Sequence, residues 1–221
     1  MANRIQPSGR IAENLYLLNL GFVGIYVLDA GECLVAFDAG MKPGAVLAEF
    51  SRQGLDPKRV KHVLLTHSDR DHTGGLPAFP EARVYLPRAE VAMLDHTTPR
   101  FLGLVYSKPL KVSYELLDDN QELTVGGAAI RCISTPGHTA GSMSFLVNGS
   151  VLIAGDIPNL SKGEVVMDRG FNQVDRAKQR ESIIRLAGLS GISLLGTSHS
   201  GYTPDFAAAM RKWSPLGKPQ P

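Results

Sequence analysis

The stretch VKHVLLTHSDRDHTGG, residues 60–75, decides the fold of this 221-residue chain. Its first half is a run of apolar residues that is typical of a buried β-strand. The strand is followed, within six residues, by His67, Asp69, Asp71 and His72. Because a loop at a strand end presents side chains from a rigid sheet, this loop can bring two imidazoles and two carboxylates to one point in space.

Three later residues repeat this placement at the ends of apolar runs. His138 follows CIST and the turn PG, Asp156 ends VLIAGD, and His199 follows ISLLGTS. Alone, each would more often be a hydrogen-bonded side chain or a turn cap. Together with the first loop, they form a set of imidazole and carboxylate donors that suits zinc, iron or manganese. Since no cysteine belongs to the set, we expect an open catalytic metal site rather than a closed structural one.

The remaining chain alternates strand and helix patterns in two similar rounds. Apolar runs bounded by turn residues predict strands at 13–20, 22–30, 32–40, 60–67, 83–87, 111–117, 121–125, 128–135, 142–148, 151–156 and 192–199, and amphipathic spacing predicts helices at 45–55, 88–96, 173–189 and 204–213. This order predicts an α+β fold, a four-layer αββα sandwich of two mixed β-sheets with helices on the outer faces. We expect residues 1–221 to form a single domain.

Composition and charge exclude several kinds of partner. Hydrophobic residues make up 43% and charged residues 20% of the chain, and 23 Lys and Arg against 21 Asp and Glu leave a net charge of +2. This small charge argues against nucleic acid or an anionic membrane as partner. The sequence lacks a signal-peptide-like start and a run of roughly 20 apolar residues, so we expect a cytoplasmic location. Cys33 and Cys132 stand in strand-like segments and are expected to be reduced core thiols.

With these motifs together, the sequence resembles the metallo-β-lactamase fold hydrolases, which include glyoxalase II, quorum-quenching lactonases and flavodiiron proteins. The family motif HxHxDH is matched in THSDRDH, with aspartate instead of histidine at its second position. Later family ligands are matched in TPGHTAGS, IAGD and TSHSG, and FDAG, with Asp38, matches an acidic turn that supports the site. The resemblance extends from Leu15 to Trp213 and is specific for fold and metal binding more than for substrate.

The resemblance implies a ligand set and a reaction. A first metal would be held by His67, Asp69 and His138, a second by Asp71, His72 and His199, with Asp156 bridging the two. We therefore expect two divalent ions, zinc first and iron or manganese as alternatives, that share a hydroxide able to cleave a small ester, thioester or lactone. Asp71 is also expected to be catalytic, by orienting the nucleophile or passing its proton to the leaving group.

Asp69 leaves two other functions open. A third carboxylate lowers the positive charge of the metal cluster and favours harder ions such as iron or manganese. The flavodiiron relatives also carry a carboxylate here and reduce dioxygen or nitric oxide, which in this chain would require an external electron donor. A non-catalytic metal-binding protein is the second alternative.

Two branches of the family are disfavoured. The antibiotic-degrading branch lacks an aspartate where Asp156 stands, and the near-neutral charge of this chain argues against the nucleic-acid-processing branch.

The substrate, a small molecule, is expected to contact the loops at 97–108 and 157–172. Candidate pocket residues in and near these loops are Tyr106, Arg169, Phe171 and Tyr202. His62 and His96 do not fit the ligand series and are expected to be structural or solvent-facing. Exposed strands in this fold often pair, so the sequence leaves a homodimer open.

Overall fold

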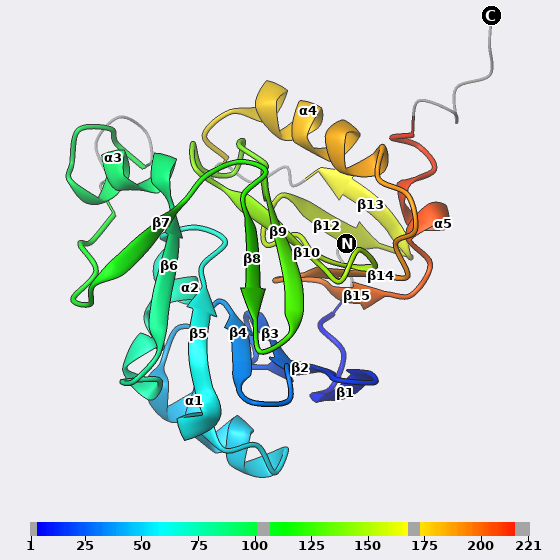
Figure 1. Ribbon diagram of the computed structural model, residues 1–221. Helices are drawn as coiled ribbons and strands as arrows, with labels where there is room; N and C mark the ends of the chain where they lie inside the picture. The colour runs from blue at the N-terminus through cyan, green and yellow to red at the C-terminus, as the bar shows by residue number, and fades with distance from the viewer. Residues whose placement is uncertain (1–3, 101–106, 168–172, 215–221) are drawn as a thin grey trace, which may run out of the picture.

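The computed structural model describes residues 4–100, 107–167 and 173–214. Within them the chain forms a seven-stranded sheet in the order β1-β2-β3-β4-β5-β6-β7 and a six-stranded sheet in the order β15-β14-β11-β10-β9-β8. A two-stranded sheet, β12-β13, adjoins the second. Figure 1 shows α1 beside the first sheet and α4 above the second.

The first sheet is antiparallel at its N-terminal end and parallel from β4 onward. Its strands are β1 (Gly9–Ala12), β2 (Leu15–Asn19), β3 (Gly24–Asp29), β4 (Leu34–Phe37), β5 (Val60–Leu64), β6 (Arg83–Pro87) and β7 (Tyr114–Leu117). Parallel neighbours need a crossover, and α1 (Pro43–Arg52) supplies the one between β4 and β5. Short helical turns complete this half: η1 (Pro57–Arg59), α2 (Arg70–Thr73), η2 (Leu76–Ala78), η3 (Arg88–Glu90) and α3 (Val91–Leu94).

The second sheet is antiparallel except where β11 and β14 run parallel. Its strands are β8 (Glu122–Val125), β9 (Ala128–Ser134), β10 (Met143–Val147), β11 (Val151–Ile153), β14 (Leu194–Thr197) and β15 (Gly201–Thr203). The hairpin of β12 (Pro158–Ser161) and β13 (Glu164–Met167) and the helix α4 (Arg176–Ala187) lie between β11 and β14, and α5 (Phe206–Met210) follows β15. Asp175 caps α4 by accepting hydrogen bonds from the amides of Ala177 and Lys178.

Three apolar clusters separate the layers. One lies between the two sheets, where the rings of Phe37 and Phe145 are 5.6 Å apart. A second packs α1, through Val46 and Phe50, on the outer face of the first sheet. A third packs α4 and α5, with residues such as Ile183, on the outer face of the second sheet. The predicted four-layer αββα sandwich is therefore confirmed.

Some predicted elements differ from those observed. The 157–172 segment, expected to be a substrate loop, contains the β12-β13 hairpin, which turns at Lys162 and Gly163 with positive φ angles. The helix expected at 88–96 is a 3-10 turn followed by the single turn α3. The short strands β1 and β15 were not predicted, because three or four half-exposed residues give no periodic signal.

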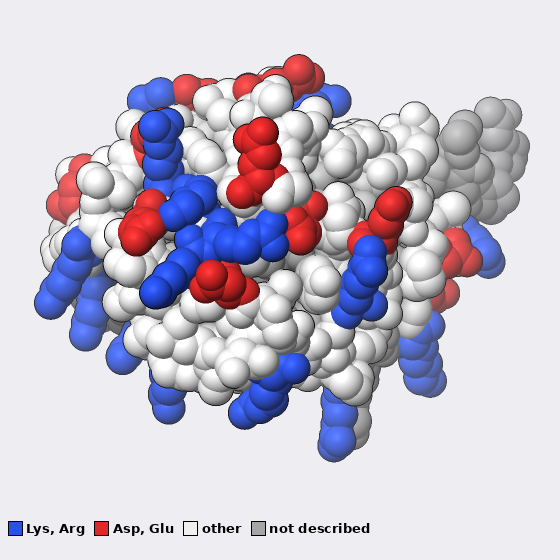
Figure 2. Space-filling view, turned by 60° about the horizontal axis from the view of Figure 1, so that its bottom comes forward, with Lys and Arg blue, Asp and Glu red and all other residues white. Residues whose placement is uncertain are grey.

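The surface mixes charges of both signs. Figure 2 shows one face on which a band of Lys and Arg side chains is bordered by Asp and Glu. The two signs also meet in exposed ion pairs, such as Lys61–Glu81 and Arg88–Asp118, each at 2.7 Å. Cys33 and Cys132 are buried and free, as predicted. None of the helices in the described part of the chain is long and apolar enough to span a membrane.

Candidate metal centre

The ligand candidates come from four loops at strand ends of both sheets. His67, Asp69, Asp71 and His72 follow β5, where Leu65 to Asp69 form a loop that leads into α2. The other three come from the second sheet: His138 from the β9–β10 connection, Asp156 from the turn after β11, and His199 from the turn between β14 and β15. The site therefore lies where the ends of the two sheets meet.

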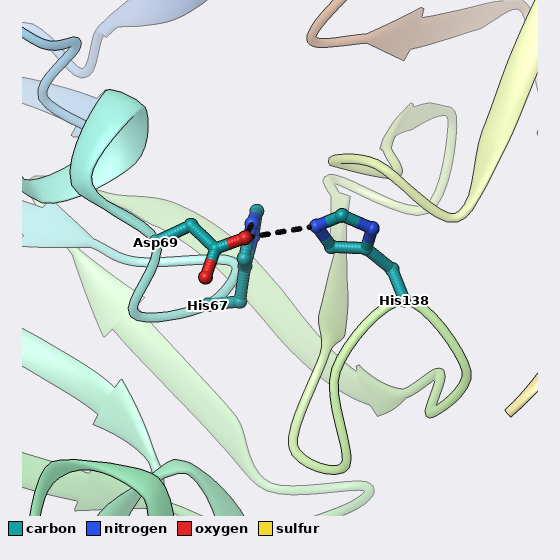
Figure 3. Close-up of side chains that lie close together, drawn as sticks. All are labelled: His67, Asp69 and His138. Atoms are coloured by element: carbon teal, nitrogen blue, oxygen red, sulfur yellow. Dashed lines mark hydrogen bonds and ion pairs between the residues drawn. The ribbon is translucent and has the colours of Figure 1, made fainter. Parts of the chain in front are cut away.

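The structure brings all seven candidates together in three overlapping groups. The groups are His67, Asp69 and His138; His67, His72 and Asp156; and Asp71, His72 and His199, and within each group the potential ligand atoms lie within 4.8 Å of one another. Figure 3 shows the first group, with the Asp69 carboxylate directed at the His138 ring.

Asp156 lies between the two outer groups. Its Oδ2 atom is 3.5 Å from Nε2 of His138 and 3.0 Å from Nε2 of His199, while its Oδ1 atom is 3.3 Å from Nε2 of His72. This central position is the one expected of a bridging ligand.

Hydrogen bonds to Asp38 and Thr66 orient two of the imidazoles. Asp38 Oδ1 accepts from the Thr66 amide at 2.7 Å, and Oδ2 lies 2.8 Å from Nδ1 of His72. The Thr66 hydroxyl donates to Asp38 and lies 2.9 Å from Nδ1 of His67. From these contacts we assign a proton to Nδ1 of each ring. The Nε2 atom of each ring is therefore the one directed at the site.

His199 is oriented in the same way from the first sheet. Its Nδ1 atom lies 2.8 Å from the carbonyl oxygen of Phe22, and the two rings are 4.7 Å apart. Phe22 is otherwise exposed, at 68%. This contact holds His199, a candidate ligand from the second sheet, against the loop between β2 and β3.

Tight glycine contacts place the first ligand loop against the Asp38 turn. Asp38 has a φ of 65°, a left-handed conformation that aspartate tolerates better than most residues. The next residue, Ala39, donates its amide to the His72 carbonyl at 2.7 Å. A Cβ at Gly75 would lie 1.9 Å from the Ala39 carbonyl oxygen. Only glycine allows this approach, which explains the glycine that follows the ligand motif.

Glu90 joins the two ligand loops that face each other across the site. It is fully buried. One carboxylate oxygen accepts from the Ser68 amide at 2.7 Å, and the other accepts from the Thr139 hydroxyl at 2.5 Å and the Gly141 amide at 3.0 Å. Glu90 therefore ties the loop of His67 to that of His138.

The ionisation of the site reflects its crowded charges. Burial opposes the charged forms of His72 and His199, but neighbouring carboxylates, Asp156 foremost, raise the pKa of His72 well above its ordinary value and that of His199 to about 10. Burial likewise opposes a charged Asp156, yet the nearby histidines hold its pKa well below the usual range. The metal-free cluster therefore holds its carboxylates charged and retains protons that a metal ion would displace.

The donor atoms fit a metal ion. Among the described residues, Nε2 of His67, Nε2 of His72 and Oδ1 of Asp156 are buried and have no hydrogen-bond partner. Buried polar atoms almost always have a hydrogen-bond partner. Three such atoms that converge without one, each able to coordinate a metal, are therefore evidence for a cation site.

The other sequence candidates lie elsewhere. Tyr202 packs against the apolar cluster between the sheets, whereas Tyr106, Arg169 and Phe171 lie outside the described residues. His62 pairs with Tyr85, with 3.1 Å between Nδ1 and the phenol oxygen, and His96 lies 3.1 Å from the Ser107 carbonyl oxygen. Neither histidine belongs to a ligand group, in agreement with the expectation from sequence.

Sequence reasoning did not identify Thr66, Glu90, Arg100 or Phe22. Arg100 is 7% exposed and forms an ion pair with Asp69. These residues act from outside the ligand motifs, and three of them come from other loops or turns. Only Thr66 could have been found from the sequence, because it directly precedes His67.

A cleft of about 440 Å³ borders the site on the Asp69 side. Asp69 and Arg100 lie in its wall. Much of the remaining wall is apolar and comes from Leu76, Pro77, Pro109, Leu110 and Val112, and Arg70, Lys108 and Lys111 add positive charge.

Known proteins resemble this chain in sequence and in fold. A family model described as the metallo-beta-lactamase superfamily matches residues 18–191. The lactamase-like protein adaB of Aspergillus niger is 27% identical over 85% of this chain and 53% of its own length. The probable metallo-hydrolase YqgX of Bacillus subtilis is 29% identical over 70% of each chain.

Solved structures extend the likeness to nearly the whole chain. A metallo-beta-lactamase family protein from Thermus thermophilus is 27% identical, with a TM-score of 0.69 over 94% of this chain and 79% of that one. A B3 metallo-beta-lactamase with an active-site glutamic acid has a TM-score of 0.71 over 95% of this chain and 86% of that one. At 23% identity, the second likeness concerns the fold alone.

This chain belongs to the metallo-beta-lactamase superfamily. Its described part brings together histidines and aspartates that could hold a metal ion, and one relative, YqgX, is described as a probable metallo-hydrolase. The chain spans about half the length of adaB, at 53%.

Proposed function

We propose that residues 1–221 form a catalytic domain that uses two divalent metal ions to hydrolyse a small ester, thioester or lactone. The observation that carries this proposal is the convergence of seven imidazole and carboxylate side chains, several with buried, unpaired donor atoms. His67, Asp69 and His138 would hold one ion and Asp71, His72 and His199 the other, with Asp156 between them. Zinc is the first candidate, and iron or manganese are the alternatives.

The bound ions would supply a nucleophile at neutral pH and polarise the substrate carbonyl. The protein's part is to orient the ligands. The Thr66 hydroxyl accepts the Nδ1 proton of His67, Asp38 accepts that of His72, and the Phe22 carbonyl accepts that of His199. Fixed ring positions keep each Nε2 atom directed at the site before any ion enters, so that at these rings an ion has only to displace the Nε2 protons of His72 and His199.

Asp71 is our candidate for proton transfer. Its Oδ2 atom lies 3.3 Å from Nε2 of His199 and 3.5 Å from Nε2 of His72. Its side chain is 18% exposed, more than that of Asp156, so it lies at the solvent side of the cluster. A carboxylate there can take a proton during attack and return it to the leaving group.

The cleft beside Asp69 is proposed to receive the acyl part of the substrate. Its apolar wall, which includes Leu76 and Leu110, suits a short hydrocarbon or aromatic group, and its volume of about 440 Å³ is in the range of small-molecule sites. Lys108 and Lys111 favour substrates that also carry a negative charge.

Elemental analysis of protein purified without added metal, followed by assays with esters, thioesters and lactones on the same sample, tests the proposal. We expect two ions per chain and turnover that is lost in His72→Ala. His62→Ala is the matched control, because His62 is a partly buried histidine outside the ligand groups, and it should keep both metal and activity. Metal-loaded protein without turnover on any of the three classes would contradict the hydrolase and favour a non-catalytic metal-binding protein.

Asp69 favours one alternative, a di-iron protein that reduces dioxygen or nitric oxide with an external electron donor. Three carboxylates surround the candidate centre, which suits harder ions. Two irons per chain, a redox-active visible spectrum and no ester turnover would support this alternative. Zinc or manganese with ester turnover would exclude it.

A further inference from the structure

Arg100 brings a buried positive charge to the edge of the candidate metal centre. The residue is 7% exposed. Its guanidinium makes two contacts with Asp69, from Nε to Oδ1 at 2.6 Å and from Nη2 to Oδ2 at 2.5 Å. Two-pronged pairs of arginine and carboxylate combine strong hydrogen bonds with a fixed geometry. Arg100 therefore holds both oxygens of Asp69.

The same guanidinium also reaches His138. Its Nη2 atom lies 3.0 Å from Nε2 of the imidazole. Arginine is always protonated and has no acceptor, so Nε2 of His138 must be the acceptor in this contact. Asp69 Oδ2 lies 3.2 Å from the same Nε2 atom, along the dashed line in Figure 3. With Nε2 accepting from Arg100, this contact brings two lone pairs together, as at a site for a cation. Arg100 thus contacts two atoms that the first ligand set would offer to a metal ion.

The negative charge of Asp69 explains why a cationic side chain lies beside the first ligand set. Asp69 brings a negative charge that a histidine at this position would not bring, and Arg100 neutralises it. In the second ligand set, the Oδ2 atom of Asp71 instead faces His72 and His199. The competing positive charge there is a proton, which leaves for the solvent when an ion binds, whereas the guanidinium at the first set is fixed to the chain.

We infer that Arg100 is a built-in cation of the first ligand set, which a metal ion must displace from Asp69 and His138 before it can bind there. This inference rests on the proposed metal centre. It orders the loading of the site: the second set, Asp71, His72 and His199, fills first and tightly, and the first set fills later and more weakly.

A zinc titration of chelator-treated protein tests this order without an activity assay. Bound ions are counted by elemental analysis, and affinities are measured by competition with a chromophoric chelator. We expect one tight ion and a second that binds more weakly in the wild type. Arg100→Gln should tighten the second ion by about tenfold or more, about 1.4 kcal/mol, because the ion no longer has to displace a guanidinium from two of its ligands. Arg88→Gln is the matched control, since Arg88 makes a similar two-pronged pair with Asp118 at the surface.

A second readout uses the metal-free protein. With chelator present, Arg100→Gln should unfold at a lower temperature than the wild type, because Asp69 loses its partner, and saturating zinc should narrow this difference. Arg100→Lys keeps the charge without the two-pronged geometry and should tighten the second ion by a smaller factor. This variant also serves as the test if the glutamine variant does not fold.

Two equal affinities in the wild type, or a second ion that binds Arg100→Gln no more tightly than the wild type, would overturn the inference while leaving the metal centre in place. If neither protein binds zinc, manganese or iron, the proposed metal centre itself is wrong.

Discussion

Replacing Asp38 with asparagine tests how the ligand histidines are oriented. In the native site, Oδ1 of Asp38 accepts the Thr66 amide and Oδ2 faces Nδ1 of His72. The oxygen of an asparagine must stay with the Thr66 amide, which can only donate, so its NH2 group faces His72. The imidazole then has to accept at Nδ1 and carry its proton on Nε2, where it can no longer bind a metal ion. Asparagine tolerates the positive φ of this position, so the backbone should not be strained.

Metal affinity in Asp38→Asn should fall by about 10- to 100-fold, the range for residues that support metal ligands. Loss of one hydrogen bond to a charged group should also lower the free energy of unfolding of the metal-free protein by about 2 kcal/mol. Chelator competition measures the first effect and urea unfolding with chelator the second. Asp118→Asn, at an exposed ion pair, should change neither. Unaltered metal affinity in Asp38→Asn would refute the tautomer argument.

Three further results are expected. Because Asp156, despite the opposing effect of burial, raises the pKa of His199 to about 10, and the histidines hold the pKa of Asp156 well below its usual range, metal-free protein should be most stable between about pH 4 and 6.5, the unfolded values of the two groups, and should lose stability as the pH rises toward 10. Urea midpoints that stay constant from about pH 6.5 to about 10 would contradict this. Glu90→Ala should destabilise the protein by about 3 kcal/mol or more, because three buried donors lose their acceptor, and should weaken metal binding, whereas a loss below about 1 kcal/mol in urea unfolding would show that Glu90 does not join the loops. Burial raises the pKa of Cys132 to about 12, so a thiol reagent at pH 8 should modify it only after unfolding, and rapid reaction of the folded protein would count against the buried position.

The convergence of the seven candidate ligands could be predicted from the sequence, because each stands in a short motif at the end of an apolar strand. The supporting residues could not. Glu90 and Arg100 lie 22 and 31 residues from the residues of the first ligand loop that they contact, and they reach this loop through the tertiary fold around β5 and β6. The Phe22 carbonyl is a backbone group and has no sequence signal at all. Sequence reasoning therefore reached the residues whose placement is encoded locally and missed those whose placement depends on tertiary contact.

Glu90 also affects how the centre chooses its ions. Its three donors, the Ser68 amide, the Thr139 hydroxyl and the Gly141 amide, are held as soon as the chain has folded. The conformational entropy of the two ligand loops is therefore lost during folding rather than when an ion binds. Apart from the displacement of Arg100, the two loops need little rearrangement of their own when an ion binds, but they cannot widen to suit a larger one. Calcium, which takes six to eight oxygen ligands at longer distances, should thus be rejected by the rigidity of the loops as well as by the imidazole donors.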